Sequence, residues 1–196
     1  MNLKVAEYFY SLQGEGFRAG HPSIFIRLTG CDLACGFCDT EFESGKEMSV
    51  QELLAIIQQW PCKWIVWTGG EPMLQLTEAI TLFFNAQGYQ QAIETNGNHR
   101  IDRERMWFDW ITCSPKVAEH VLEKNFPQGV DELRYVRHSG QPGVPKPRIE
   151  AKNKYLSPIF DGATPNEKNL RHCIQLCLDN PEWKLSLQTH KILRVL

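Results

Sequence analysis

The chain has 196 residues, of which 42% are hydrophobic and 22% charged, and its formal net charge is −2. This length is enough for one domain with a real core. The near-neutral charge and the lack of a Lys/Arg cluster give no reason to expect a nucleic-acid partner. Met1–Lys4 lead directly into an amphipathic strand, so we expect neither a signal peptide nor a membrane span. Seven cysteines are an odd number for a disulfide framework, which favours the reducing cytoplasm.

Hydrophobic periodicity predicts strands alternating with helices along the chain. The capping box Ser49-x-x-Glu52 begins a helix that Pro61 ends, and a second helix covers 74–86. Thr164-Pro165-x-Glu167 begins a third helix that ends at about Asp179. The predicted strands are residues 3–10, 23–28, 63–68, 90–94, 107–112, 132–136, 154–156 and 183–188. This alternation indicates a parallel α/β sheet with right-handed crossovers.

Glycine-rich and polar motifs fall at or just past the carboxyl ends of the predicted strands. That edge is where α/β barrels build their sites. The predicted strands after residue 48 number about six rather than eight, which indicates an open partial barrel. The motifs are Gly69-Gly70-Glu71-Pro72, Glu94-Thr95-Asn96-Gly97, Ser114-Pro115-Lys116 and Leu156-Ser157-Pro158.

Three cysteines, Cys31, Cys35 and Cys38, lie close together after the second predicted strand. Three thiolates suit soft, iron-rich chemistry, and three ligands on a four-iron cube leave one iron open for a substrate or cofactor. A zinc knuckle is one alternative, but no fourth Cys or His lies at the usual short spacing. A loop of unrelated thiols is the other alternative.

The Cys31-x3-Cys35-x2-Cys38 loop, with Phe37 before its last cysteine, resembles the cluster loop of radical S-adenosylmethionine (SAM) enzymes. The run from Gly30 to Thr40 resembles the 7-carboxy-7-deazaguanine synthases of the queuosine pathway. The resemblance covers nearly the whole chain and implies an open partial (β/α)6 barrel of the radical SAM type. It implies a single domain over 1–196, with N-terminal strands and cluster loop in 1–48 and βα repeats in 49–196. The implied cofactors are a 4Fe-4S cluster on the three cysteines, SAM and Mg²⁺.

The run Gln13-Gly14-Glu15-Gly16 predicts a glycine turn after the first strand. Gly14-x-Gly16-x-x-Ala19 formally matches a dinucleotide fingerprint, but that motif must open a helix, and a β-rich run follows here. A plain hairpin with an exposed Glu is the other interpretation. The run resembles the substrate loop of the synthases, where close backbone approach to a flat ligand is needed.

The resemblance also implies the residues that contact SAM. In the Gly-Gly-Glu-Pro stretch, two glycines let Glu71 approach the amino group. Ser114 and Lys116 place a hydroxyl and a cation near one point, suited to the carboxylate or ribose. The full implied set is Phe37, Cys38, Asp39, Gly70, Glu71, Glu94, Ser114, Pro115, Lys116, Ser157 and Phe160.

Thr40 corresponds to the synthase threonine that gives its hydroxyl to Mg²⁺, an ion that keeps waters and takes few protein ligands. Among the histidines, His190 is selected because Gln188-Thr189-His190-Lys191 resembles the C-terminal substrate contact of the family. The resemblance implies no catalytic side chain, because the cofactors supply the radical. The implied substrate-binding residues are Leu12, Gln13, Gly14, Glu15, Arg27, Thr68, His190 and Leu196.

The implied reaction is the ring contraction of 6-carboxy-5,6,7,8-tetrahydropterin to 7-carboxy-7-deazaguanine with loss of ammonia. A flavodoxin or ferredoxin is the expected electron donor. We expect a cytoplasmic homodimer that binds neither nucleic acid nor membrane.

An activase for a glycyl-radical partner shares the cluster loop, but Thr40 and the Gln-Gly-Glu-Gly run speak against it. A non-enzymatic zinc or redox-sensing module is a further alternative, which metal analysis separates. The remaining cysteines, Cys62, Cys113, Cys173 and Cys177, are expected to be structural; Cys173 and Cys177 are spaced i, i+4 on a helix as small hydrophobes.

Overall fold

The computed structural model describes residues 1–36, 38 and 41–195. The chain packs as two compact units. The first contains Met1–Ser11, Pro22–Thr95 and Ile101–Ile111, and the second contains Leu12–His21, Asn96–Arg100 and the residues from Thr112 onward. These limits do not coincide with the expected boundary at residue 48, and the single domain over 1–196 stays a prediction.

The strands of the first unit follow the order β3-β1-β2-β4-β5. Neighbours β2, β4 and β5 are parallel, whereas β3 is an edge strand antiparallel to β1. The predictions for β1, β2, β4 and β5 are confirmed. Strand β3 is absent from the predicted strands because most of its four residues are charged or polar. The bounds are β1 (Asn2–Leu12), β2 (Pro22–Leu28), β3 (Lys46–Ser49), β4 (Trp64–Gly69) and β5 (Gln90–Thr95).

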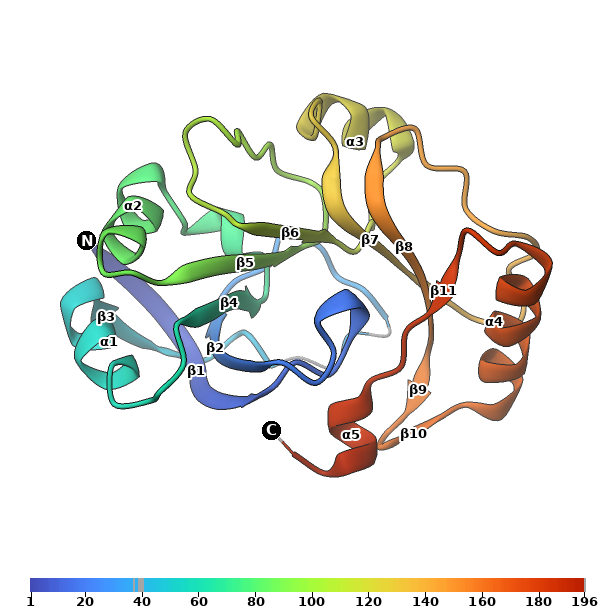
Figure 1. Ribbon diagram of the computed structural model, residues 1–196, viewed down its shortest axis with the longest axis horizontal. Helices are drawn as coiled ribbons and strands as arrows, with labels where there is room; N and C mark the ends of the chain where they lie inside the picture. Colours follow the sequence, from blue (N-terminus) through green and yellow to red (C-terminus); the bar gives the residue numbers. More distant parts are fainter. Residues whose placement is uncertain (37, 39–40, 196) are drawn as a thin grey trace. The chain divides into compact units, whose positions relative to one another are not determined.

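Helices α1 (Val50–Ile57) and α2 (Glu78–Ala86) pack beside β3 and β5 in the first unit (Figure 1). The predicted capping box is confirmed, because Ser49 Oγ accepts from the Glu52 amide while the Glu52 carboxylate accepts from the Ser49 amide. The predicted start at Leu74 is wrong. A 3₁₀ turn, η2 (Pro72–Leu74), comes first, and Thr77 is the N-cap of α2.

An aromatic core lies within the first unit. Phe9 and Phe25 stack with ring centroids 5.0 Å apart, and Val66 and Ala92 complete this buried cluster. These residues come from β1, β2, β4 and β5, so the core fixes neighbouring strands to one another. Burial of such side chains stabilises each by about 1.5–3 kcal/mol.

The strands of the second unit follow the order β6-β7-β8-β11, and all neighbours are parallel. The strand β6 begins in the first unit and ends in the second. The strand β6 starts at Trp110 rather than at 107, and β11 is shorter than predicted. A two-stranded hairpin of β9 and β10 is a further element. The bounds are β6 (Trp110–Cys113), β7 (Val130–Arg137), β8 (Ala151–Pro158), β9 (Phe160–Asp161), β10 (Thr164–Pro165) and β11 (Lys184–Leu185).

Helix α4 (Glu167–Asp179) packs beside β8 and β11, with Leu156, Cys173, Leu176 and Trp183 in the shared core (Figure 1). Its predicted end is confirmed. Its predicted start is wrong, because Thr164 and Pro165 form β10 and the side chain of Asn166 caps the helix. Three short helices, η1 (Gly16–Arg18), α3 (Glu119–Asn125) and α5 (Thr189–Leu193), were outside the predicted elements.

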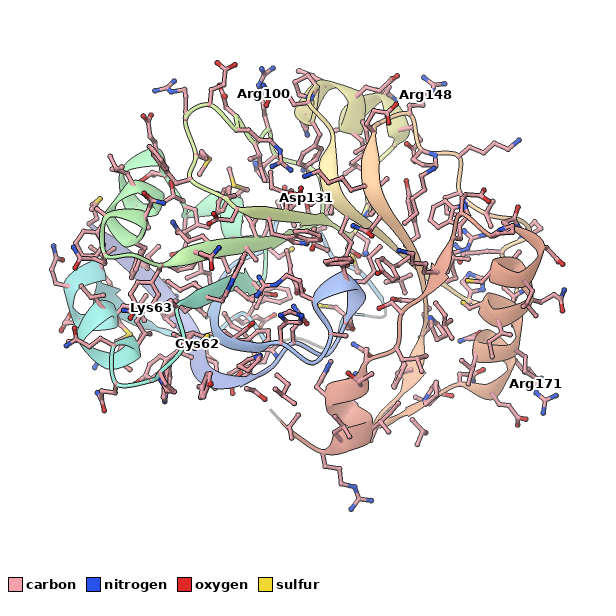
Figure 2. The ribbon with its side chains drawn as sticks, viewed as in Figure 1. Cys62, Lys63, Arg100, Asp131, Arg148 and Arg171 are labelled. Carbon is pink, nitrogen blue, oxygen red and sulfur yellow. The ribbon has the colours of Figure 1, made fainter. Side chains whose placement is uncertain are left out.

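In each unit the polar motifs follow parallel strands, as predicted. The strand β4 ends at Gly69 and β5 at Thr95 in the first unit, while β6 ends at Cys113 and β8 at Pro158 in the second. At the opposite end of β7, the buried Asp131 pairs with Lys152 at 2.7 Å (Asp131 is labelled in Figure 2).

None of the helices in the described ranges is long and apolar enough to cross a membrane.

Candidate active site

The three clustered cysteines lie in a loop of the first unit that is closed at its base. The Gly30 amide donates to the Phe42 carbonyl at 2.9 Å, and the Cys38 amide donates to the Cys35 carbonyl at 3.0 Å. Cys31 and Cys35 are half-buried, Cys38 is exposed, and none of the three is in a disulfide. The loop therefore presents three accessible thiols within a short closed segment.

This set of donors fits an iron–sulfur cluster by its chemistry, because three thiolates are soft ligands and no carboxylate or water-type ligand is needed. Within residues 1–36, 38 and 41–195, however, no three His, Cys, Asp or Glu side chains are close enough together to hold a metal ion. The predictions for Phe37, Asp39 and Thr40 fall outside the described residues. The cluster ligands thus stay a prediction that the sequence of the loop and its accessibility support.

The Gly-Gly-Glu-Pro turn packs directly against the entrance of the cysteine loop. The Glu71 amide donates to the Gly30 carbonyl at 2.8 Å, and the Gly70 amide donates to the Leu28 carbonyl at 3.0 Å. A side chain at Gly70 would collide with the Gly30 carbonyl oxygen, so the close approach requires glycine. The two motifs that the sequence predicts to serve the cluster and SAM are therefore physically joined.

Glu71 itself is fully buried at the end of β4. Both of its carboxylate oxygens lie 2.9 Å from the Thr95 hydroxyl, and one also accepts from the Met73 amide at 3.0 Å. This carboxylate caps η2 and fixes the loop. Thr95 was not among the candidate residues, although it stands in the Glu-Thr-Asn-Gly motif at the end of β5.

Other predicted residues of the first unit have partners on neighbouring strands. The Thr68 hydroxyl donates to the Glu94 carboxylate at 3.2 Å, so a predicted substrate residue and a predicted SAM residue lie together. Arg27 pairs with Glu7 at 3.1 Å, and its guanidinium lies 5.4 Å from the centre of the Phe9 ring. Arg27 is therefore held over β1.

The Gln-Gly-Glu-Gly loop follows Leu12, the last residue of β1, and belongs to the second unit. The Gly14 carbonyl accepts from the Thr189 amide at 3.0 Å and from the Thr189 hydroxyl at 2.7 Å. The His190 ring packs on the backbone of Gly14. The structure thus brings the predicted C-terminal residue His190 to the predicted substrate loop, with Gln13 buried beside them.

A buried ion-pair network contacts this loop. It contains the predicted residue Glu15, whereas its other members, Glu132 and Arg134, were not among the candidate residues. Glu15 pairs with Arg134 at 2.9 Å, and Arg134 lies 3.6 Å from Glu132. Burial, and next the charge of Glu132, raise the pKa of the Tyr155 hydroxyl, so this neighbouring group stays neutral at physiological pH. The available signal was a group of charged residues, Asp131, Glu132 and Arg134, inside a strand whose first five residues are all buried.

Four further predicted residues, Ser114, Pro115, Lys116 and Ser157, lie at the ends of β6 and β8. The Lys116 ammonium donates to the Ser114 hydroxyl at 2.7 Å, with Pro115 between them, and the Lys116 amide donates to the Asn96 carbonyl at 3.0 Å. Ser157 is 5% exposed, and its hydroxyl has no hydrogen-bond partner in the described part of the chain. A buried polar atom without a partner is unusual and suits a group that a ligand completes.

One more predicted residue, Phe160, belongs to the second group. Phe160 lies in β9, and the Lys191 ammonium is 5.6 Å from the centre of its ring. The prediction for Leu196 falls outside the described residues. The candidate residues therefore form two groups, one with the cysteine loop in the first unit and one with the Gln-Gly-Glu-Gly loop in the second.

Comparison with known proteins identifies the family. The Radical SAM superfamily model matches residues 25–148. A 7-carboxy-7-deazaguanine synthase of Haemophilus influenzae is 38% identical over 206 residues, covering 99% of this chain and 94% of that protein. The protein of the same name from Bacteroides thetaiotaomicron is 35% identical over 195 residues, with full coverage of both chains.

A solved structure gives the same result. The crystal structure of QueE from Escherichia coli matches with a TM-score of 0.74 at 28% identity, covering 97% of this chain and 95% of that one. The predicted fold class, an open and mostly parallel α/β fold of the radical SAM type, is confirmed. The chain belongs to the 7-carboxy-7-deazaguanine synthase family of radical SAM enzymes.

Proposed function

We propose that the chain catalyses the Mg²⁺-dependent ring contraction of 6-carboxy-5,6,7,8-tetrahydropterin to 7-carboxy-7-deazaguanine with loss of ammonia, as a lyase of queuosine biosynthesis. Full-length similarity to synthases of that name supports this reaction. The observation that carries the proposal is the three-cysteine loop joined at Gly30 to the Gly-Gly-Glu-Pro turn. That junction brings the predicted cluster ligands beside the predicted SAM loop.

The thiolates of Cys31, Cys35 and Cys38 would hold the 4Fe-4S cluster. When bound, the cluster and SAM supply reductive SAM cleavage and the organic radical that starts the reaction. The chain's own residues bind the cofactor and substrate, orient them and exclude water. The resemblance implies no catalytic side chain among them, because the cofactors supply the radical.

The proposed SAM contacts are those that the family resemblance implies. Lys116 is already held by Ser114 and offers an ammonium to a carboxylate or ribose oxygen. The Ser157 hydroxyl has no hydrogen-bond partner among the described residues, so it can form its hydrogen bond with a bound ligand. The Glu71 carboxylate holds its loop in the shape that receives the amino group. The remaining SAM contacts that we propose are Phe37, Cys38, Asp39, Gly70, Glu94, Pro115 and Phe160.

The substrate is expected to bind through the side chains of Glu15 and Arg27 and through the Mg²⁺ held by Thr40. Glu15 supplies a carboxylate that Arg134 keeps in place, and Arg27 supplies a cation for the opposite end of the pterin. Thr40 would give its hydroxyl oxygen to Mg²⁺, which has room for substrate oxygens because it takes few protein ligands. The remaining proposed substrate contacts are Leu12, Gln13, Gly14, Thr68, His190 and Leu196.

Further parts of the proposal concern partners. A flavodoxin or ferredoxin would supply the electron, and the active form would be a cytoplasmic homodimer.

Anaerobic assay tests the function. The protein is purified and reconstituted without oxygen, supplied with SAM, Mg²⁺, a reductant and the carboxytetrahydropterin, and the deazaguanine product is measured. Product formation by the wild type and its loss in Cys35→Ala are expected. A wild-type protein that carries a full iron–sulfur cluster but forms no product would contradict the proposed substrate, and bound zinc in place of iron would contradict the enzyme class.

A further inference from the structure

Arg134 on β7 is one of the most buried charged side chains of the second unit. Its side chain is 7% exposed, and it lies between Glu15 at 2.9 Å and Glu132 at 3.6 Å. The side chains of Glu132 and Glu15 are 2% and 15% exposed. Removing ions from water is costly, so three buried charges persist only where they are closely paired.

Glu132 on β7 and Ser186, the residue after β11, support the backbone of the Gln-Gly-Glu-Gly loop. The Phe17 amide donates to the Glu132 carboxylate at 2.9 Å, and the Gly16 amide donates to the Ser186 hydroxyl at 2.9 Å. Gly16 has a φ of +69°, and a side chain there would collide with the Glu132 carboxylate. The loop therefore rests directly on Glu132, and its own Glu15 reaches back to Arg134.

Strand register shows which way this network faces. Glu132, Arg134 and Val136 alternate along β7 and pair with Asn153, Tyr155 and Ser157 on β8. Residues two apart share a face, and paired residues on neighbouring strands share it too. Arg134 thus lies on the same face of the sheet as the orphaned hydroxyl of Ser157. Two independent observations, an ion-pair network and an unsatisfied hydroxyl, mark this face as the ligand side.

We propose that Arg134 is a positioning residue for the substrate, acting through Glu15. Its guanidinium fixes the direction of the Glu15 carboxylate and separates that carboxylate from the carboxylate of Glu132. The Gln-Gly-Glu-Gly loop, which contacts the side chains of Arg134 and Glu132, therefore keeps one conformation. Without that cation the two carboxylates repel and the loop moves away from Glu132. This inference rests on the proposed function, in which Glu15 binds the pterin.

Arg134→Lys is the informative variant, because it keeps the charge and loses the planar fork of donors. We expect the KM for the carboxytetrahydropterin to rise about tenfold or more, with a smaller change in kcat, because a charge-assisted contact is misplaced rather than the chemistry removed. Arg134→Gln, which removes the positive charge that pairs with Glu15, serves as the harsher variant, and its thermal melting is measured beside it.

A double-mutant cycle separates positioning from a general structural role. If Arg134 acts through Glu15, adding Arg134→Lys to Glu15→Gln should raise KM by less than about twofold. Arg171→Lys is the matched control, because Arg171 points away from α4 into solvent and pairs only at the surface with Glu167 (Figure 2). That control should match the wild type in KM.

Amide hydrogen exchange gives a readout that needs no substrate. In Arg134→Lys the Gly16 and Phe17 amides should exchange faster than in the wild type, while amides of α4 should not change. Wild-type KM with wild-type exchange in the loop would overturn the inference, and so would a full KM effect of Arg134→Lys in the Glu15→Gln background. If the wild type itself makes no product, the proposed function fails, and the exchange of these two amides still decides whether Arg134 positions the loop.

Discussion

Replacing Glu71 by Ala should weaken SAM binding while the iron–sulfur cluster remains. Glu71 is fully buried, and it is not a thiolate, so its loss leaves the cluster ligands in place. Its carboxylate accepts from the Thr95 hydroxyl and from the Met73 amide. The variant loses both of these contacts.

The structure gives a magnitude for each loss. The bond from the Met73 amide is a cap, and removing a cap costs about 1 kcal/mol of stability. The Thr95 bond is assisted by charge and is worth about 1.5–3 kcal/mol. Glu71→Ala should therefore lower the free energy of unfolding by about 2.5–4 kcal/mol. If the loop holds the SAM amino group by one charge-assisted contact, SAM affinity falls by about ten- to a hundredfold.

The assay is SAM binding to anaerobically reconstituted protein, measured by equilibrium dialysis, with iron content and thermal melting measured on the same sample. Thr95→Val is the matched control, because it keeps the Glu71 carboxylate and removes only the hydroxyl. It should lose stability but less SAM affinity than Glu71→Ala. Unchanged SAM affinity in a folded, cluster-bearing Glu71→Ala protein would refute the reasoning, as would an equal loss of affinity in Thr95→Val.

Three shorter predictions concern the cluster, the metal and one helix. Cys35→Ala should abolish the brown absorbance and SAM cleavage, and SAM cleavage by this variant would contradict the ligand assignment. Cys173→Ala should retain both, because Cys173 lies on the buried face of α4 and burial raises the pKa of its thiol to about 11. Thr40→Ala, or chelation of Mg²⁺, should lower product formation but spare uncoupled SAM cleavage, and indifference of wild-type turnover to Mg²⁺ would rule this role out. Ser49→Ala should cost about 1 kcal/mol in a denaturant melt, since it removes the cap of α1. Hydrogen bonds from Ser49 lower the pKa of the Glu52 carboxyl. Their contribution to stability is therefore present at neutral pH, and it is lost as the pH falls through the lowered pKa of Glu52.

Local signals predicted the parts of the fold whose causes are local. The capping box at Ser49 contains all the atoms that begin α1, and its prediction is confirmed. The start of α4 was wrong because Thr164 and Pro165 pair with β9 instead. A tertiary partner there overrides a motif that is otherwise typical of a helix start. Strand β3 shows the same effect, since its polar residues become a strand only by pairing with β1.

Candidate residues were found where a motif marks them in the sequence, and missed where their role comes from pairing. Ser114 and Lys116 stand two apart in one motif, and they do lie together. Thr95 and Arg134 are different, because their importance lies in reaching Glu71 and Glu15 from distant parts of the chain. A single sequence does not show which residues from distant parts of the chain come into contact in the fold.

The strand β7 nevertheless carries a pattern that could identify such residues in advance. All residues from Val130 to Arg134 are buried, yet Glu132 and Arg134 alternate with the fully buried Leu133. In a half-exposed strand the charged residues would face water and the apolar ones the core. Here both faces are covered, so the buried charges must pair with other polar groups: Asp131 pairs with Lys152, and Arg134 pairs with Glu15. In a chain already expected to fold as an α/β barrel, buried charges within a strand therefore predict polar partners from other segments of the chain rather than contact with solvent alone, and the Glu15–Arg134 pair is such a case.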